Sequence, residues 1–239
     1  MKKVILALII IIMVYSNSYS QIFNKFSIAV GPVFGWNVPA VSDLNNEMKK
    51  AGIPEFSTSG VFGMGGSVFI DVPVVKGLRV GYTGYGFTEN STSTFASNSK
   101  VAEFSYSTNS LSIEYVKKVG VLFDWSIGGQ LGIGSTSLKL ANYSNAFKEW
   151  NIGNYLNDTN STGHNTVSFK TTSFSIIPQT GLGFQASRFL YFKLNAGYVF
   201  TVNSKWKADD IIEINNFPSG IKGDGFMFNL GVYVGFFID

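Results

Sequence analysis

The chain ends on Gly225 to Asp239, written GFMFNLGVYVGFFID, and this stretch decides the fold. Large apolar residues fill its even positions from Phe226 to Ile238, whereas most of its odd positions are small or amphipathic. Successive side chains of a strand point to opposite faces, so the pattern predicts a strand with one wholly apolar face. A soluble sandwich core can use such a strand. A closed transmembrane barrel fits better, because the apolar face then contacts lipid and the other face lines the lumen.

The first residues predict export. Lys2 and Lys3 form a positive region, Val4 to Tyr15 an apolar run, and Ser18 to Ser20 a small-x-small cleavage site. This order is typical of a signal peptide. The apolar run is shorter than the roughly 20 residues that a spanning helix needs. We therefore expect a cleaved signal peptide over residues 1–20 and a mature barrel domain over residues 21–239.

Composition narrows the class of protein. Charged residues make up 14% of the chain, against about 25% in soluble domains. The chain has no cysteine, which excludes disulfides and a thiol nucleophile. Its net charge of +3 includes the two lysines of the signal peptide. The mature chain therefore lacks the basic field that nucleic-acid binding requires, and we expect no nucleic acid among its partners.

Alternating apolar residues recur along the whole mature chain and predict eight strands. They are about Phe26–Trp36, about Thr58–Ile70, a strand from Leu78, a strand ending near Val116, Val121–Gly134, about Val167–Phe184, Leu190–Phe200 and Gly225–Asp239. Pro32 falls inside the first strand, where it requires a local irregularity in the pairing.

Long polar connections alternate with short turns between these strands. The long ones are Asn37–Ser57, Thr88–Lys100, Lys139–Asn165 and Ser204–Asp224. This asymmetry predicts an all-β fold, an eight-stranded antiparallel transmembrane up-and-down β-barrel with long extracellular loops and short periplasmic turns. An even strand number places both termini in the periplasm. Eight strands leave room for little more than side chains, so we expect a sealed lumen.

Three local features are expected within this pattern. Ser42 can cap a short helix that ends at Gly52, and a second short helix is expected around 145–150. Phe104 and Tyr106 have the opposite parity to Leu111. Either a bulge near 108–109 or an aromatic plug facing the lumen would explain this.

Charged residues at inward positions form the candidate site. Arg79, Glu114, Asp124 and Lys193 each lie within a few residues of a short turn, so we expect them at similar depth near the periplasmic end. Our hypothesis is a structural lumen charge cluster that plugs the barrel, because opposite buried charges are tolerated as a satisfied set. The alternative is that each charge is hydrated separately in a small water-filled space.

These features carry a resemblance. The signal, the eight strands and the ending resemble the small outer-membrane β-barrel proteins of Gram-negative bacteria, which include OmpA-like, OmpX-like and PorT-like barrels and are grouped with the porin family. Asn229, Gly231, Val234 and Phe236 also fill the places of the signal read by the barrel-assembly machinery, although residues 237–239 extend past it. The resemblance implies integral insertion in the outer membrane, with its lipid and the assembly machinery as partners. It transfers no activity.

An enzymatic alternative would be a lipid-modifying barrel that uses a histidine, a serine and a carboxylate. The single histidine, His164, lies in the longest predicted loop with Ser161 and Asp158 nearby. Nearness in sequence does not make a triad, so we expect no enzyme and no catalytic residues. Four carboxylates, Asp209, Asp210, Glu213 and Asp224, could bind calcium, but their spacing is not that of a known calcium loop. We expect neither a metal nor a cofactor.

Two functions of different class remain. The favoured one is a non-catalytic outer-membrane barrel whose loops contact a partner protein, a surface or lipid, especially through Asn37–Ser57 and Lys139–Asn165. The alternative is a channel or sensor for a small ligand that binds beneath these loops.

Overall fold

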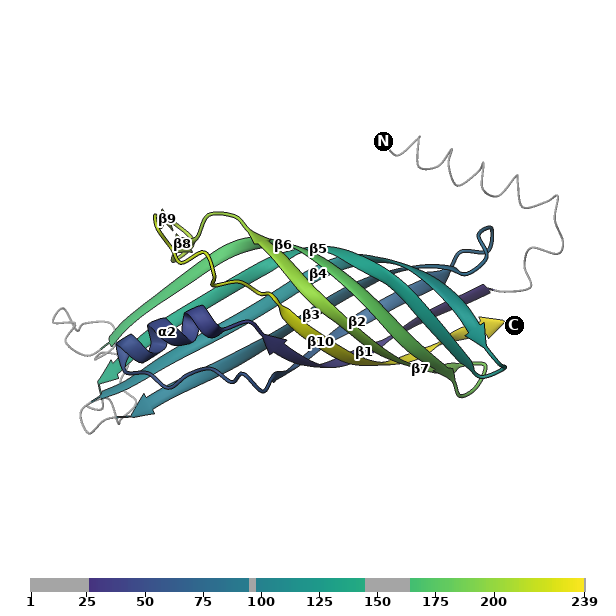
Figure 1. Cartoon of the computed structure of the whole chain (residues 1–239), viewed down its shortest axis with the longest axis horizontal. Coiled ribbons are helices and arrows are strands. Elements are labelled where there is room, and N and C mark those ends of the chain that lie inside the picture. Colours follow the sequence, from purple (N-terminus) through teal and green to yellow (C-terminus); the bar gives the residue numbers. More distant parts are fainter. Residues whose placement is uncertain (1–25, 95–97, 145–163, 239) are drawn as a thin grey trace, which may run out of the picture.

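The strands form a closed ring. The structure is a computed structural model and describes residues 26–94, 98–144 and 164–238. Its elements are β1 Phe26–Pro39, α2 Ser42–Ala51, β2 Val61–Asp71, β3 Leu78–Thr94, β4 Asn98–Val119, β5 Phe123–Ser144, β6 His164–Gln185, β7 Leu190–Asn203, β8 Lys207–Ala208, β9 Ile212–Glu213 and β10 Gly225–Ile238. Antiparallel pairing runs from β1 through β2, β3, β4, β5, β6 and β7 to β10, which pairs with β1 (Figure 1). The predicted eight-stranded antiparallel barrel is therefore confirmed.

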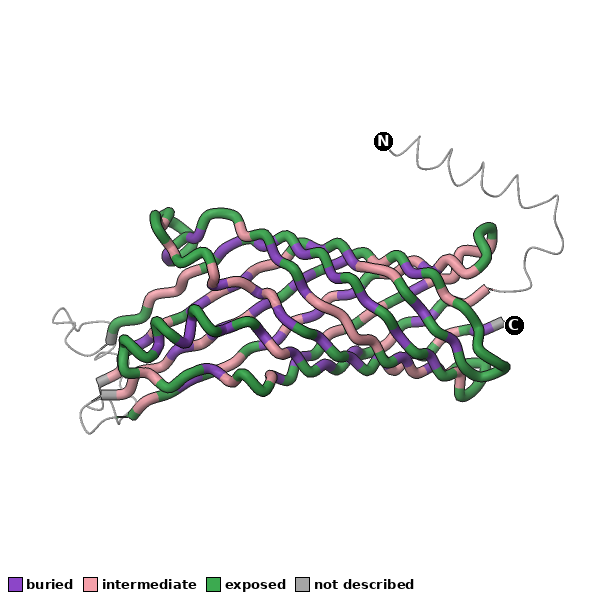
Figure 2. Tube along the Cα trace, viewed as in Figure 1, coloured by how far each residue is buried: buried purple, intermediate pink, exposed green. Residues whose placement is uncertain are grey.

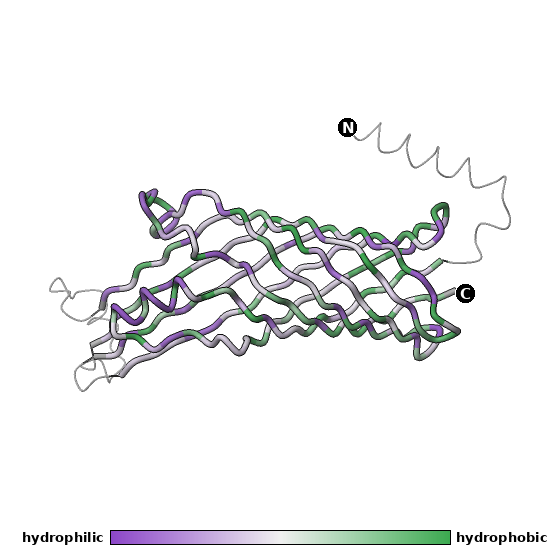
Figure 3. The backbone as a smooth tube through the Cα atoms, viewed as in Figure 1, coloured by the Kyte–Doolittle hydropathy of each residue, from purple (hydrophilic) through white to green (hydrophobic). Residues whose placement is uncertain are grey.

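The last strand behaves as its alternation predicts. Along β10 the even residues from Phe226 to Phe236 lie outward, while the odd residues from Gly225 to Phe237 lie mostly on the buried lumen face (Figure 2). The same alternation recurs on the other ring strands. We call the outward-facing apolar side chains the apolar belt; on β5 it runs from Phe123 to Ile133 and on β6 from Phe174 to Phe184. Figure 3 shows hydrophobic residues repeating along the ring strands and hydrophilic ones concentrated on α2.

The connections differ at the two ends of the ring. Residues 72–77, 120–122 and 186–189 make short links at one end, which we call the turn end. Phe26 of β1 pairs there with Ile238 of β10. The opposite end, the cap end, carries α2 and the β8–β9 hairpin (Figure 1). None of the helices in the described ranges is both long and apolar enough to cross a membrane.

The strands extend into two of the predicted long loops, Thr88–Lys100 and Lys139–Asn165, so the predicted bounds of these loops are wrong. β3 continues to Thr94, β4 begins at Asn98, β5 continues to Ser144 and β6 begins at His164. Hydroxyl pairs on the outer face join β4 and β5 next to these extensions, with Ser105 Oγ 2.6 Å from Ser137 Oγ. On the inner face Ser91 is buried and donates to the carbonyl of Pro54, and Phe104 and Leu138 of the adjoining strand segments are buried, so this end of the strands has a buried side that the polar composition of the segments concealed. The helix expected around 145–150 lies outside the described residues.

The remaining local expectations have mixed outcomes. The pairing of β3 with β4 continues without a break from Leu78 to Thr94, so no bulge is present, and Phe104 and Tyr106 point inward as the aromatic-plug alternative predicts. The pairing of β1 with β10 skips Gly31 and Pro32, which confirms the irregularity. Proline lacks the N–H that the ladder needs.

The helix prediction is confirmed except for its cap. α2 begins at Ser42, but Val41 holds the cap position and no side-chain hydrogen bond caps the helix. Its C-terminal end follows the expectation. Gly52 adopts a left-handed conformation with φ of 68°, and its N–H donates to the carbonyl of Lys49 at 3.1 Å. Glycine accepts this backbone angle without steric cost.

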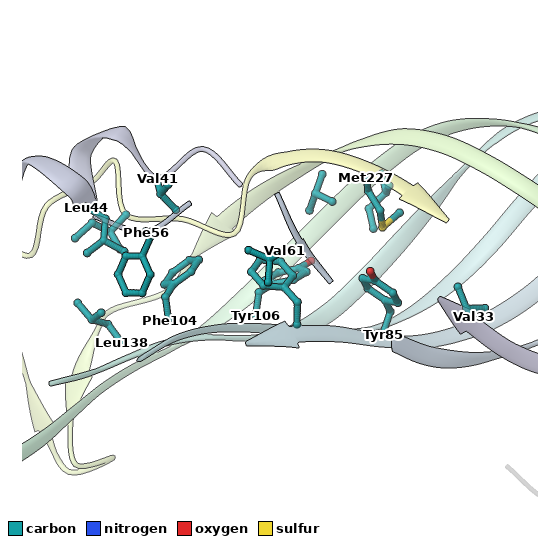
Figure 4. Close-up of a cluster of buried hydrophobic side chains, with 14 of the residues drawn as sticks. Val33, Val41, Leu44, Phe56, Val61, Tyr85, Phe104, Tyr106, Leu138 and Met227 are labelled. Atoms are coloured by element: carbon teal, nitrogen blue, oxygen red, sulfur yellow. The ribbon is translucent and has the colours of Figure 1, made fainter. Parts of the chain in front are cut away.

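A second apolar core lies at the cap end, above the belt. α2, residues 52–60 and residues 204–224 cover the inner face of the extended strands β3 to β6, and we call these three segments the cap. Phe56 and Phe104 lie side by side in this core, with Leu44 and Leu138 beside them (Figure 4). The cap therefore closes the ring at one end with packed apolar side chains.

Candidate functional site

All four charged residues of the predicted cluster point into the barrel. Arg79, Glu114 and Lys193 are each 4% exposed and Asp124 is 7% exposed. They come from β3, β4, β7 and β5, respectively, and Arg79 lies directly opposite Glu114 in the ladder. Each charged residue lies between residues of the apolar belt along its strand. Because successive side chains point to opposite faces, the charged side chain points into the lumen.

Glu114 and Lys193 form a buried ion pair. Lys193 Nζ donates to Glu114 Oε1 at 2.6 Å. Gln179 Nε2 donates to the same oxygen at 2.6 Å, and Gln130 Nε2 donates to Gln179 Oε1 at 2.8 Å. Ser110 Oγ completes the chain by donating to Gln130 Oε1 at 2.6 Å. This continuous set of hydrogen bonds crosses the lumen and compensates the two buried charges.

Arg79 and Asp124 belong to a second chain. Arg79 Nε donates to Asp71 Oδ1 at 2.7 Å, and Arg79 Nη1 donates to the hydroxyl of Tyr191 at 3.0 Å. That hydroxyl donates in turn to Asp124 Oδ1 at 2.9 Å. The guanidinium also lies 4.1 Å from the centre of the Phe69 ring. Tyr191 therefore joins two predicted residues that do not touch each other.

Sequence reasoning missed several members of these chains. Tyr191 occupies an odd position two residues before Lys193, so its parity was an available signal for the lumen face. Gln179 has the opposite parity to Leu182 in the predicted strand Val167–Phe184, which indicates the lumen face but no role. Asp71 was assigned to the turn after the second strand, whereas it is the last residue of β2 and pairs with Arg79. The turn assignment concealed a carboxylate that the guanidinium needs.

Aromatic rings fill the lumen near the turn end. Tyr233 and Tyr191 lie 4.9 Å and 5.7 Å from Phe69, measured between ring centres, and Phe237 lies 5.3 Å from Tyr191. All four rings are at least nine-tenths buried. Together with the two polar chains, this aromatic layer fills the lumen of the barrel at the turn end.

Some lumen oxygens lack partners among the described residues. They are Ser126 Oγ, Asn195 Oδ1 and Asn229 Oδ1. Asn195 lies opposite Asn229 on one side and Gly181 on the other, and Gly181 lies opposite Ser126, so the three groups share one level of the ladder. Buried polar atoms of this kind typically bind ordered water. Small hydrated spaces are therefore expected between the side chains of the lumen.

Polar contacts hold the cap onto the ring. Asp224 Oδ1 accepts hydrogen bonds from the N–H and the hydroxyl of Thr201, both at 2.6 Å. Glu89 Oε1 accepts one from the N–H of Ser57 at 2.6 Å. Burial raises the pKa of Glu89, and the hydrogen bond from Ser57 opposes that shift. On the other side Trp206 stacks on Phe217 with ring centres 4.1 Å apart.

The acidic residues considered for calcium have separate partners. Asp209 Oδ1 accepts from the N–H of Ser168 at 3.0 Å, and Asp210 lies 3.9 Å from Lys170. Glu213 pairs with Lys205 at 2.7 Å, and the hydrogen bond from this lysine lowers the pKa of the carboxyl. In the part of the chain that the structure describes, no group of three or more acidic, histidine or cysteine side chains is arranged to hold a metal.

The structure does not test the catalytic alternative, because most of its residues lie outside the described part of the chain. Ser161 and Asp158 lie outside the described residues. His164 is the first residue of β6, and the position of its side chain is not among the described features. The absence of an enzyme therefore stays a prediction.

Comparisons with known proteins found similar solved structures but no family. No protein-family model and no curated protein matches the chain. Among solved structures it is similar to a major outer membrane protein of Thermus thermophilus, with 11% identity, a TM-score of 0.48 and coverage of 88% of this chain and 99% of that one. It is also similar to Ail of Yersinia pestis in complex with sucrose octasulfate, with 11% identity, a TM-score of 0.45 and coverage of 89% and 98%.

A third solved structure, CarO2 of Acinetobacter baumannii, shows 8% identity and a TM-score of 0.39, covering 88% of this chain and 99% of that one. Identities this low concern the fold alone. The all-β antiparallel ring of eight strands rests on the strand pairing itself.

Proposed function

We propose that this chain is a non-catalytic integral outer-membrane β-barrel protein with a sealed lumen, and that its cap contacts a partner protein, a surface or lipid. In this proposal residues 1–20 direct export and are removed. The turn end, with both termini, faces the periplasm, and the cap lies outside the cell. Short periplasmic turns and longer external connections are the usual orientation of such barrels.

One observation carries the proposal, namely that the apolar face of the sheet changes sides along the strands. In the belt the apolar side chains point outward and the charged ones inward, as lipid requires. At the cap end Phe104, Leu138 and Phe56 point inward and the outer face is rich in hydroxyls, as water requires. A ring that is apolar outside at one level and polar outside at the next suits a membrane boundary between them.

The sealed lumen rests on its contents. The aromatic layer of Phe69, Tyr191, Tyr233 and Phe237, the two polar chains and the cap core follow one another along the barrel. We expect conductance in planar bilayers near the background of protein-free membranes. Substantial conductance that Lys193→Glu alters would overturn the sealed lumen, since it would place that residue beside an ion path.

Membrane insertion has its own test. The folded barrel should fractionate with the outer membrane and migrate differently on denaturing gels before and after boiling. External protease should reach the cap in intact cells, whereas a tag at the C-terminus should be protected. Recovery of the folded protein in the soluble periplasm would contradict insertion.

A small-ligand channel or sensor is the second candidate. The observation in its favour is the level of unpartnered oxygens at Ser126, Asn195 and Asn229, which leaves hydrogen-bonding capacity inside the barrel. The conductance measurement separates the two candidates. If His164→Ala altered the acyl composition of membrane lipid, both would give way to the lipid-modifying alternative.

A further inference from the structure

The outer face of the ring carries an apolar furrow that crosses six neighbouring strands. Ladder pairing aligns two rows of outward side chains along it. One row is Trp125, Leu182, Leu194, Leu230 and Phe34, and the other is Thr180, Ala196, Phe228, Trp36 and Phe62. The hollow between the rows has a volume of about 690 Å³. β6, β7, β10 and β1, which carry its centre, are consecutive in the ring (Figure 1).

Small residues make the furrow deep at its middle. Ala196 lies in the second row between Thr180 and Phe228, which both have larger side chains. Gly35 and Gly181 lie on the strands between the two rows and also line the hollow. The aromatic and leucine side chains on either side therefore form ridges above a floor of backbone.

The outward polar side chains along the furrow have partners within the protein, whereas Asn195 and Asn229, which also line the hollow, lie on the lumen face of their strands. Trp125 Nε1 donates to Thr180 Oγ1 at 3.0 Å, and Thr180 Oγ1 donates to the carbonyl of Ser126 at 2.9 Å. Trp36 Nε1 donates to the carbonyl of Ser59 at 3.0 Å. The furrow therefore offers apolar contact without a demand for hydrogen bonds, which selects an apolar occupant.

The dimensions of the furrow favour a thin, extended occupant. It crosses five strand spacings, roughly 24 Å at about 4.8 Å each. For strands tilted about 40° it rises roughly 15 Å along the barrel axis, comparable to half of the ~30 Å hydrocarbon core. The two rows stand two residues apart on each strand, roughly 7 Å, so a helix about 10 Å across would rest on the ridges rather than fill the space. A partner strand cannot add here, because each strand along the furrow is already paired on both sides.

We propose that the furrow is a binding site for one acyl chain of a membrane lipid. Trp36 and Phe62 lie at the cap end of the belt, so the chain enters from the leaflet on the cap side. Lipid tails already surround the belt, so transfer from bulk lipid gains little from the hydrophobic effect; preference comes from close packing against the rigid ridges. This inference rests on the proposed membrane insertion.

The test compares two substitutions that each place a phenylalanine on the lipid-facing surface. Ala196→Phe fills the furrow, whereas Val30→Phe, the control, lies on the outward face of β1 outside it. Each full-length barrel is purified in mild detergent, stripped of lipid, and mixed with palmitoyl-oleoyl phosphatidylethanolamine. Native mass spectrometry then counts the lipids that stay bound. The wild type and Val30→Phe should retain one lipid, and Ala196→Phe at least tenfold less.

Leu194→Ala supplies a second variant, because it removes a ridge and should also weaken retention about tenfold even if Ala196→Phe does not fold. If Val30→Phe, Leu194→Ala and the wild type retain equal amounts of lipid, the furrow is not the binding site. The same holds if the wild type is a dimer that Leu194→Ala dissociates, because a second copy of the chain would then occupy the furrow. If the wild type migrates identically before and after boiling and stays outside the membrane fraction, the proposed function fails instead. A barrel that inserts normally but retains no lipid refutes this inference alone.

Discussion

The belt and the strand ends that the cap covers lie on the same strands, with opposite faces apolar. On β4, Leu111 points outward and is 66% exposed, whereas Phe104, seven residues nearer the cap end, points inward and is fully buried. The backbone pairing does not change between them. The difference shows that neither face of a strand is apolar by necessity. The medium around each part of the barrel decides which face must be apolar.

The two regions are therefore stabilised by different forces. In water the cap gains from burying apolar surface, since that surface would otherwise be hydrated. In lipid the outward apolar side chains gain little, and stability depends on backbone hydrogen bonds and on the satisfied polar chains of the lumen. Four predictions test this contrast.

Removing a ring from the cap core should have the largest effect. Phe104→Ala leaves a cavity between Phe56 and Phe87, with an expected cost to cap stability of about 3–5 kcal/mol. Phe174→Ala, on the lipid face of the belt, should cost less because lipid can occupy the space. Limited proteolysis of residues 37–60 measures the cap, and gel mobility before boiling measures the ring. Equal loss in both variants would remove the distinction between the two regions.

A charge on the outward face should distinguish the two levels of one strand. Leu111→Arg places a guanidinium in the belt, at an expected cost of about 2–4 kcal/mol. Val101→Arg lies on the same face of β4 at the cap end, where its charge meets water, and should change stability little. Urea unfolding in lipid vesicles compares them. A similar cost at both positions would place the membrane boundary elsewhere.

Breaking the lumen chain at its bridging hydroxyl should have an intermediate effect. Tyr191→Phe removes one hydrogen bond from Arg79, which keeps its contact with Asp71, and one from Asp124, at about 1–3 kcal/mol for the buried groups. Tyr82→Phe, the matched control on the lipid side, loses a single hydrogen bond to Asn109 and should cost less. Thermal unfolding in detergent reports both. An unchanged midpoint for Tyr191→Phe would favour separately hydrated lumen charges.

Titration of the cap should have the smallest effect. The pKa of Glu89 is raised by burial, so the folded cap favours the protonated form. The stability of the folded cap should therefore fall as the pH rises from the ordinary glutamate pKa of 4.5 through the raised pKa of Glu89. Glu89→Gln should remove this slope. The carboxyl is partly exposed, which keeps the change below about 1 kcal/mol. Cap proteolysis across this pH range, with ring mobility as the reference, measures it.

Strand parity allowed much of the fold to be predicted. It assigned Phe226 to Phe236 to the outer face and Arg79, Glu114, Asp124 and Lys193 to the lumen. It failed where the environment changed. The segments 88–94 and 139–144 are rich in serine, threonine, asparagine and lysine, and their strands depend on neighbours distant in sequence, such as Ser105 opposite Thr88 and Glu103 opposite Lys139.

The pairings in the lumen were beyond sequence reasoning for a related reason. Glu114 meets Lys193 across the barrel interior, between strands that are not neighbours in the ring. The contacts between inward residues depend on the tilt of the strands and on the sum of the register shifts around the whole ring. Neither is a property of a local stretch of sequence. Tyr191 as a bridge between Arg79 and Asp124 follows from that same geometry.

From the pairing of Phe26 with Ile238 we expect the closure of the ring to come late in folding. The two residues stand at opposite ends of the described chain, so this contact closes the longest loop available and carries the largest entropic delay. Until β10 arrives, β1 and β7 each expose an unpaired edge that invites association with other chains. A chain shortened before residue 225 would therefore lack the one element that can satisfy both edges at once.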